Sequence, residues 1–253
     1  MRHLEGKVLI VTGATRGMGL AAAVRLVADG ARVVLAARDP ERGAQVEARL
    51  RGDGAEAVFV AADLTEQTGA DAVVETAVSR FGRLDGAFNN VGGVAAPGRP
   101  ADITLANFRA ELDLNLTSAF LCLRAQLPAL LDAGGGSVVN NASLAGTTGI
   151  GGLAAYVAAK HAVVGLTRAA ALAHATDRIR VNALVTGNVD TPLYRGLLGV
   201  GPDRERANLM APNPSERVAD PAEIAAFVAF LLSDEARFIT GAALPIDGGA
   251  SAG

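Results

Sequence analysis

The sequence predicts a doubly wound α/β fold, in which a Rossmann-type parallel sheet of about seven strands carries helices on both faces. Short apolar runs rich in Val, Ile, Leu and Ala alternate with longer Ala-rich segments that carry Arg and Glu. A glycine-rich turn follows the first apolar run. The 253 residues contain no linker-like tract, so we expect residues 1–253 to form a single domain.

The strand candidates are nearly continuous in apolar residues, as expected for a sheet buried on both faces. They are residues 7–12, 32–37, 57–62, 84–90, 137–143, 179–185 and 242–247. Helices are expected at residues 17–29, 40–51, 67–81, 104–132, 152–175 and 221–232. Residues 188–216 contain four prolines and are too long for an ordinary connection, so they are predicted to form a substrate-loop insertion.

Composition argues against several classes of partner. A net charge of −3 and a charged fraction of 19% do not suggest a nucleic-acid surface. Cys122 is the single cysteine, and the three histidines lack metal-ligand spacing, so no metal site is expected. The amino end has no apolar signal core, and the longer apolar stretches are expected to fall short of membrane-spanning length. These features predict a cytoplasmic protein with no membrane partner.

The turn after the first strand candidate reads Thr12-Gly13-Ala14-Thr15-Arg16-Gly17-Met18-Gly19. Glycines allow a tight turn and bring a pyrophosphate close to the free N–H groups at the start of a helix. Three glycines alone are a weak signal, but the end of the first strand is where a dinucleotide binds in this fold class. We therefore expect a cofactor-binding turn with the spacing G-x3-G-x-G.

Tyr156 and Lys160 are four residues apart in a chain that has two tyrosines and two lysines. Residues at this spacing share a helix face. An ammonium about 5 Å from a phenolate, at an effective dielectric of about 20, lowers the phenol pKa by roughly 2 units from about 10. The pair is therefore expected to make the phenol acidic enough to exchange protons near neutral pH.

The motifs TGATRGMG, Asn89-Asn90-Val91-Gly92, Tyr156-x3-Lys160 and ITGAALPIDGG, with Asn115 and Ser143 between them, span the whole chain. Together they resemble the compact type of short-chain dehydrogenase/reductase. The resemblance implies that Tyr156 is the general acid or base and that Ser143 polarises the substrate oxygen. It also implies that Lys160 binds the nicotinamide ribose and lowers the phenol pKa, while Asn115 supports a water-linked proton path.

The resemblance also places Ala37 where NAD-binding members carry an acid, with Arg38 next to it and Arg16 in the glycine turn. Arginine suits the 2′-phosphate of NADP, and Asp39-Pro40 is more typical of a helix start. NADP(H) is therefore favoured over NAD(H). The cofactor-binding residues implied are Gly13, Thr15, Arg16, Gly17, Met18, Gly19, Arg38, Asp63, Leu64, Asn89, Gly92, Tyr156, Lys160, Gly187, Val189 and Thr191.

Two of these contacts carry particular expectations. The resemblance implies that Asp63 meets the adenine, although it could equally cap the helix that begins near Thr65. It implies that Asn89 and Gly92 shape the floor under the ribose and nicotinamide. The family normally has Pro where this chain has Thr186, which leaves the backbone before Gly187 in question, and Val91 stands in place of the usual Ala.

The function expected is hydride transfer between a nicotinamide and a small carbonyl or secondary alcohol, as in a ketoreductase. The alternative is a catalytically silent dinucleotide-binding sensor or scaffold protein, and the intact Ser, Tyr and Lys set disfavours it. A sugar-nucleotide epimerase or dehydratase is disfavoured by the short chain and the glycine spacing. A partly apolar substrate is suggested by flanking residues that could equally be core or subunit contacts, namely Leu144, Leu153, Leu193, Tyr194, Leu197, Leu198 and Met210.

An apolar stripe on helix 104–132 fits burial either against a neighbouring subunit or within the monomer. It consists of Phe108, Leu112, Leu116 and Phe120. Because members of the family commonly form tetramers, we expect a homotetramer, or a dimer.

Overall fold

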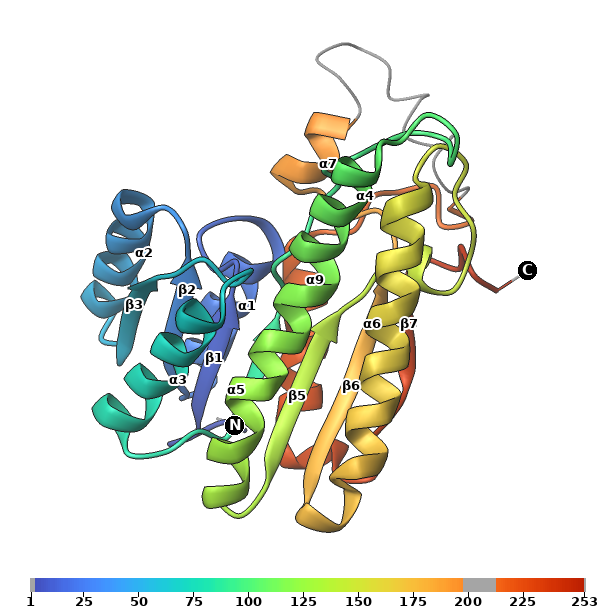
Figure 1. Cartoon of the computed structure of the whole chain (residues 1–253). Coiled ribbons are helices and arrows are strands. Elements are labelled where there is room, and N and C mark those ends of the chain that lie inside the picture. Colours follow the sequence, from blue (N-terminus) through green and yellow to red (C-terminus); the bar gives the residue numbers. More distant parts are fainter. Residues whose placement is uncertain (1–2, 198–212, 253) are drawn as a thin grey trace.

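A computed structural model describes residues 3–197 and 213–252 of the chain, and within them the predicted parallel sheet is confirmed (Figure 1). Its seven strands run in the order β3-β2-β1-β4-β5-β6-β7, and every neighbouring pair is parallel. The strands are β1 (Val8–Thr12), β2 (Arg32–Ala37), β3 (Ala57–Ala61), β4 (Gly86–Asn89), β5 (Gly136–Asn141), β6 (Ile179–Thr186) and β7 (Ala243–Ile246). All seven lie at predicted positions, and no end is shifted by more than two residues.

The helices form a layer on each face of the sheet (Figure 1). They are α1 (Gly17–Ala28), α2 (Pro40–Gly52), α3 (Gln67–Phe81), α4 (Leu105–Leu112), α5 (Ser118–Asp132), α6 (Ala154–Ala173), α7 (Pro192–Leu197) and α9 (Pro221–Leu232). One layer contains α1, α2 and α9, and the other contains α3, α5 and α6. Because each crossover begins at the edge of the sheet that carries the strand carboxyl ends, the loops that follow the strands gather there.

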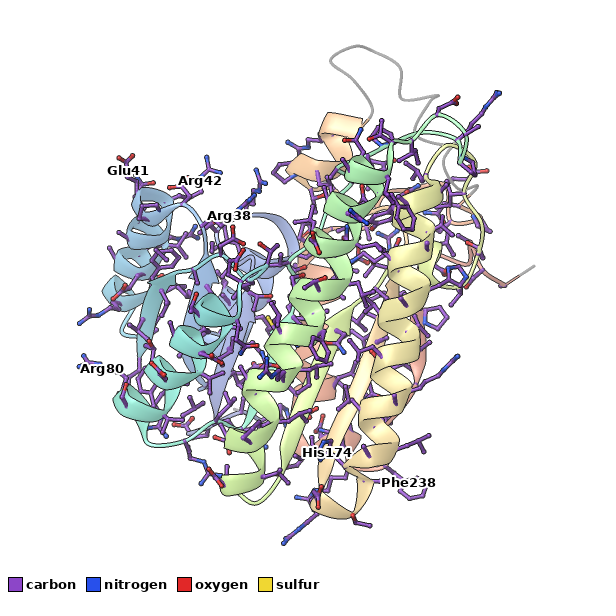
Figure 2. The ribbon with its side chains drawn as sticks, in the orientation of Figure 1. Arg38, Glu41, Arg42, Arg80, His174 and Phe238 are labelled. Carbon is purple, nitrogen blue, oxygen red and sulfur yellow. The ribbon has the colours of Figure 1, made fainter. Side chains whose placement is uncertain are left out.

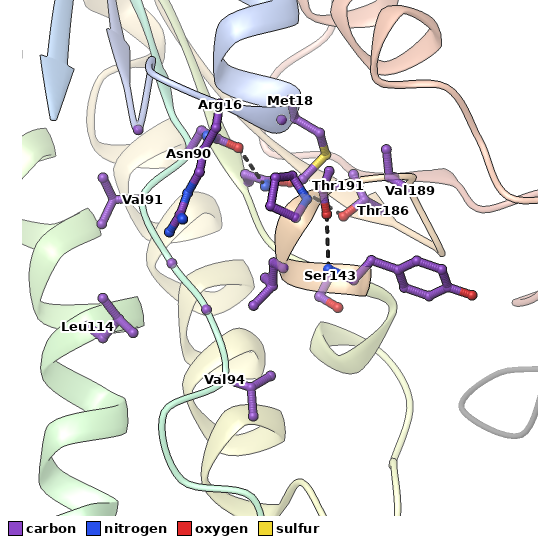
Figure 3. A pocket seen from close by; sticks show the side chains of 18 of the residues that line it. Arg16, Met18, Asn90, Val91, Val94, Leu114, Ser143, Thr186, Val189 and Thr191 are labelled. Atoms are coloured by element: carbon purple, nitrogen blue, oxygen red, sulfur yellow. Dashed lines mark hydrogen bonds between the residues drawn. The ribbon is translucent and has the colours of Figure 1, made fainter. Parts of the chain in front are cut away.

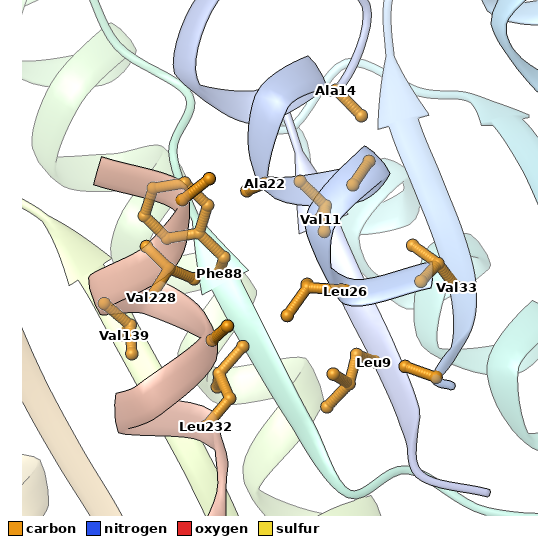
Figure 4. Packing of buried hydrophobic residues seen from close by; sticks show 14 of the residues in the cluster. Leu9, Val11, Ala14, Ala22, Leu26, Val33, Phe88, Val139, Val228 and Leu232 are labelled. Carbon is orange, nitrogen blue, oxygen red and sulfur yellow. The ribbon is translucent and has the colours of Figure 1, made fainter. Parts of the chain in front are cut away.

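The core on the α1 and α9 face is built from small residues of α1 against large residues of the central strands (Figure 4). Ala22 and Ala23 let α1 approach α9 closely, and Phe88 of β4 is fully buried beneath these helices. Every residue of β1 is buried. This packing fixes β1 and β4 side by side, and with them the loops at their carboxyl ends.

The predicted helix 104–132 is interrupted. It consists of α4, a π-helical turn at Asp113–Thr117 and α5. A π turn inserts an extra residue in a helical repeat and is often found at functional sites. The turn contains Asn115, so the side chain expected to take part in proton transfer lies at the irregular point of the helix.

The same stretch corrects an expectation about membrane-spanning length. By length and composition, Leu105–Asp132 is apolar enough to cross a membrane, whereas the sequence analysis expected no stretch to reach that length. A helix that packs in the core of an α/β domain passes the same test. Here α5 packs on α3 and on strands β4 and β5, so we interpret it as part of a helix layer of this fold and not as a membrane span.

The predicted insertion at 188–216 is only partly described. Its first part includes helix α7, where no regular element was expected. Val189 forms a bridge with Ala219, which brings the two ends of the segment together. Leu198 and Met210, named above as substrate-flanking candidates, lie outside the described residues.

Candidate active site

A cavity of about 640 Å³ lies at the carboxyl ends of the strands (Figure 3). It is next to the topological switch point between β1 and β4, where the order of the strands in the sheet reverses. This is where ligands bind in open α/β sheets. Most of the predicted site residues line it: Gly13, Thr15, Arg16, Gly17, Met18, Arg38, Asp63, Leu64, Gly92, Ser143, Tyr156, Lys160, Gly187, Val189 and Thr191. Gly19, Asn89 and Asn115 do not.

The glycine turn forms a cradle at one end of the cavity. Gly13 and Gly17 have φ angles of 63° and 55°, which side-chain-bearing residues rarely adopt. A Cβ on Gly19 would lie 2.2 Å from the Gly13 carbonyl oxygen, so Gly19 permits the close turn rather than contacting the cavity. Arg16 precedes α1 and makes no side-chain cap hydrogen bond. The N–H groups at the start of α1 are therefore suited to a phosphate.

Thr12 and Asn90 tie this turn to the end of β4. The Thr12 hydroxyl oxygen accepts hydrogen bonds from the N–H groups of Asn90 at 2.8 Å and Val91 at 3.2 Å. The Asn90 Nδ2 donates to the Thr12 carbonyl at 3.2 Å. Asn90 lines the cavity, although no role was predicted for it within its motif.

Asn89 was expected on the floor of the cofactor site, but the structure places it elsewhere. Its side chain is buried beneath the sheet edge, where it exchanges hydrogen bonds with Gln126 at 2.8 and 3.1 Å and donates to Asn140 at 3.0 Å. Adjacent residues of a strand point to opposite faces. The alternation therefore directs Asn89 into the core and leaves Asn90 at the cavity.

At the centre of the cavity Ser143, which follows β5, meets Tyr156, near the start of α6. Burial raises the pKa of the Tyr156 phenol, the neighbouring Ser143 hydroxyl lowers it, and the carboxylate of Glu111 raises it further. The net direction is upward, opposite to the expectation from Lys160 alone, because removal from water penalises the charged phenolate.

Lys160 lies one helical turn beyond Tyr156 and is buried. Its Nζ is 5.6 Å from the centre of the Tyr156 ring and donates a hydrogen bond to the Asn141 carbonyl at 2.9 Å. Burial lowers the pKa of Lys160 to about 8, and Glu111 opposes that shift. The ammonium is therefore mostly protonated at neutral pH.

Asn115 lies beneath the cavity wall, where it contacts the backbone after Asn90. Its Oδ1 accepts from Gly93 N–H at 3.1 Å, and its Nδ2 donates to the Gly93 carbonyl at 2.9 Å. A Cβ on Gly92 would lie 2.7 Å from the Asn115 Oδ1 and 3.0 Å from the Lys160 Nζ. Asn115 and Lys160 thus approach the same point of the cavity wall from two helices.

The far end of the cavity is formed by the end of β2 and the start of α2. Ala37, Arg38 and Arg42 line it, and Figure 2 shows both arginines at this end of the molecule. The Asp39 carboxylate accepts from the Arg42 N–H at 3.0 Å and so caps α2, as expected. Arg42 adds a cation that was not predicted from the sequence.

Asp63 lines the cavity and also stabilises its own loop. Its Oδ1 accepts from the Thr65 N–H at 3.0 Å and the Thr65 hydroxyl at 2.8 Å. These bonds lower the pKa of Asp63, and the bond from the Thr65 N–H has the larger effect. Arg38 lowers it further by a smaller amount. The alternative that Asp63 caps the next helix is wrong, because α3 begins at Gln67 with Glu66 as its N-cap residue. Its place at the cavity leaves the adenine contact as a prediction.

The segment after β6 closes the remaining side. Thr186 is buried, and a Cβ on Gly187 would lie 2.8 Å from the Asp247 Cα, so the close packing at this turn requires glycine. The Thr191 hydroxyl oxygen accepts from the Tyr194 N–H at 3.2 Å. Leu144, Leu153, Leu193 and Tyr194 line the cavity as expected. The side chain of Leu197 lies outside the described residues.

Comparison with known proteins places the chain among oxidoreductases. Residues 13–251 match the family model described as enoyl-(acyl carrier protein) reductase. The chain is 41% identical over 254 residues to a 2,5-dichloro-2,5-cyclohexadiene-1,4-diol dehydrogenase of Sphingobium indicum, with all of both chains covered. It is 39% identical over 244 residues to a cyclohexanol dehydrogenase of Acinetobacter sp., covering 96% of this chain and 94% of the relative. The crystal structure of levodione reductase superimposes with a TM-score of 0.93 at 38% identity, covering 98% of each chain.

Proposed function

Because the chain belongs to the short-chain dehydrogenase/reductase family, whose members act on alcohols and ketones with a nicotinamide cofactor, we propose that it is an NADP(H)-dependent dehydrogenase of cyclic secondary alcohols. The convergence of Ser143, Tyr156 and Lys160 on one cavity is the observation that carries this proposal. When bound, the cofactor supplies or accepts the hydride at the substrate carbon. The chain's own residues orient the substrate and move the proton.

In this proposal the Tyr156 hydroxyl gives its proton to the substrate oxygen during ketone reduction and takes it back during alcohol oxidation. The Ser143 hydroxyl lies beside that group and lowers its pKa, so a substrate oxygen placed between the two would be held by both. Lys160 supplies a positive charge beside the ring, which favours the phenolate. Asn115 supports the path by which the proton reaches the solvent.

The cofactor would be held along the remaining length of the cavity. The pyrophosphate fits the turn of Gly13 and Gly17, where N–H groups at the start of α1 are available. The other proposed cofactor contacts are the lining residues Thr15, Met18, Leu64, Gly92, Gly187, Val189 and Thr191. Gly19 and Asn89 act indirectly, by allowing the turn and by supporting the strand end.

The preference for NADP(H) is supported by charge at the end of β2. A carboxylate that binds the ribose of NAD usually stands there, whereas this chain has Ala37, with Arg38 and Arg42 beside it. The nearby Asp39 carboxylate is engaged in capping α2. R38D should lower kcat/KM for NADP⁺ and raise it for NAD⁺, and unchanged kinetics with both cofactors would contradict the assignment.

Ring alcohols are proposed as substrates because the names of two relatives specify cyclohexane or cyclohexadiene alcohols. Leu144 and Leu153 give the cavity apolar walls that suit a small ring. The test is an assay of NADP⁺ reduction with cyclohexanol and related cyclic and open-chain secondary alcohols. Tight NADPH binding with no turnover of any alcohol or ketone would favour the silent sensor or scaffold instead.

We further propose a cytoplasmic homotetramer or dimer. Phe108, Leu112 and Leu116 are half-buried and Phe120 is 47% exposed, so the described part of the monomer covers this stripe only in part. Light scattering should give a mass that is a multiple of one subunit. A mass of 25.6 kDa, that of a single chain, would contradict the oligomer.

A further inference from the structure

Glu111 on α4 is a fully buried acid beside the candidate site, and the reaction outlined above does not use it. Its Oε2 accepts hydrogen bonds from the N–H groups of Ala95 at 2.7 Å and Ala96 at 2.6 Å. Its Oε1 accepts from the Asn115 Nδ2 at 2.8 Å. Every one of these bonds is accepted by Glu111, which is the pattern of an ionised carboxylate. Within the described part of the chain, no basic side chain forms an ion pair with it.

The carboxylate is one of three acceptors that determine which way the Asn115 amide faces. The Asn115 Nδ2 is surrounded by three acceptors, the Gly93 carbonyl at 2.9 Å, the Glu111 carbonyl at 3.1 Å and the Glu111 Oε1. A flipped amide would point its oxygen at all three. Burying unpaired polar groups in this way is costly, so the Glu111 carboxylate and the two carbonyls together hold the Asn115 Oδ1 toward the Gly93 N–H and the cavity wall.

The same carboxylate fixes part of that wall. Gly92, Gly93, Val94 and Ala95 line the cavity, and Glu111 binds the N–H groups at the end of this segment. Hydrogen bonds between N–H groups and a charged acceptor are stronger than those between neutral groups. Glu111 therefore connects α4, the segment after β4 and the Asn115 amide in one buried network.

We propose that Glu111 is a positioning residue for the reaction, which orients Asn115, anchors the segment at Gly93–Ala96 and keeps a negative charge beside the Tyr156 and Lys160 pair. The inference rests on the proposed function of that pair. It adds to that function a carboxylate that sets the pH range in which the two groups exchange protons.

The sign of the electrostatic effect follows from the charge. A nearby anion favours the protonated forms of both groups, and Glu111 raises the pKa of Tyr156 and that of Lys160. The other ionisable side chains on the elements that pack against α4 are exposed to solvent. On α6, His161 is exposed and its Nδ1 contacts the Val157 carbonyl. Asp113 of the π turn is exposed and accepts from Thr117 Oγ1. Removing the charge of Glu111 should therefore move both ionisations to lower pH.

The direct test measures the ionisation of Tyr156 by its phenolate absorbance. The chain contains two tyrosines and no tryptophan, so Y194F leaves Tyr156 as the only tyrosine. In that background E111Q should lower the midpoint of the titration, whereas E111D, which keeps the charge, should retain the parental midpoint. An unchanged or raised midpoint in E111Q, or an equal shift in E111D, overturns the proposal. If E111Q does not fold, E111S removes the same charge and is titrated instead.

A second test follows the pH dependence of NADP⁺-linked turnover in the parental sequence. E111Q should lower kcat about tenfold at neutral pH, because Asn115 is no longer held in place, and should move the pH profile to lower values. The control is D85N, which removes a carboxylate that accepts the Val8 N–H at 2.9 Å near the opposite end of the sheet. D85N should leave the profile in place, and equal profiles for E111Q and D85N would overturn the proposal. An inactive parent would contradict the proposed function alone, because the tyrosine titration needs no substrate.

Discussion

Gly92 is the position at which a single methyl group should most selectively disturb the site. An alanine Cβ there would lie 2.7 Å from the Asn115 Oδ1 and 3.0 Å from the Lys160 Nζ. Ordinary contacts of this kind are 3.4–4 Å, so the amide or the local backbone must move by roughly 0.7 Å or more. Neither group can yield easily, because Asn115 makes four hydrogen bonds through its side chain and Lys160 is bonded to Asn141.

Displacements approaching 1 Å at a catalytic site can cost about 100-fold in rate, so we expect G92A to lose roughly 10- to 100-fold in kcat/KM. The assay is NADP⁺ reduction with a cyclic alcohol, accompanied by a thermal melt to confirm folding. The matched variant is G93A, whose Cβ would meet Leu114 at 3.7 Å and Leu193 at 3.8 Å, which are ordinary contacts. G93A should retain at least about tenfold more activity than G92A. Equal losses in the two folded variants would refute the reasoning.

Two further predictions concern stability. F88A should lower the free energy of unfolding, measured by denaturant titration, by about 3–5 kcal/mol, because Phe88 is fully buried. The control F238A, at an exposed position, should change it by less than about 0.5 kcal/mol. Comparable losses in the two variants would contradict the described core. K160M should be more stable than the parent at pH 7 by on the order of 3 kcal/mol, because burial lowers the pKa of Lys160 from 10.5 to about 8. The unfolded chain binds the Lys160 proton more tightly than the folded chain, so the parent should gain stability as pH rises from about 8 to 10.5. The stability difference between K160M and the parent should therefore shrink over this range. A difference that stays constant would contradict the buried ammonium.

The sheet could be predicted from the sequence because its signals are local. Runs such as Val8–Thr12 are apolar throughout, and a strand buried on both faces requires this. The spacing of Tyr156 and Lys160 likewise needs only helix geometry. Features of this kind depend on neighbours along the chain, and the structure places them as expected.

The network around Glu111 could not be predicted in the same way. Its spacing of four residues from Asn115 was visible, but the hydrogen bonds to Ala95 and Ala96 depend on how α4 packs against a distant segment. The π turn at Asn115 similarly has no local signal in the sequence. The upward pKa direction of Tyr156 was missed because burial, which the sequence does not quantify, exceeds the effect of a nearby cation.

The central claim is that Tyr156 transfers the proton during NADP(H)-linked alcohol oxidation. The most direct measurement compares kcat of Y156F with that of the parent on the best cyclic alcohol, together with the Kd for NADPH. Loss of a general acid or base should lower kcat by about 10²- to 10⁴-fold, while NADPH binding stays within a few-fold. A Y156F enzyme that binds NADPH and keeps parental turnover would contradict the account.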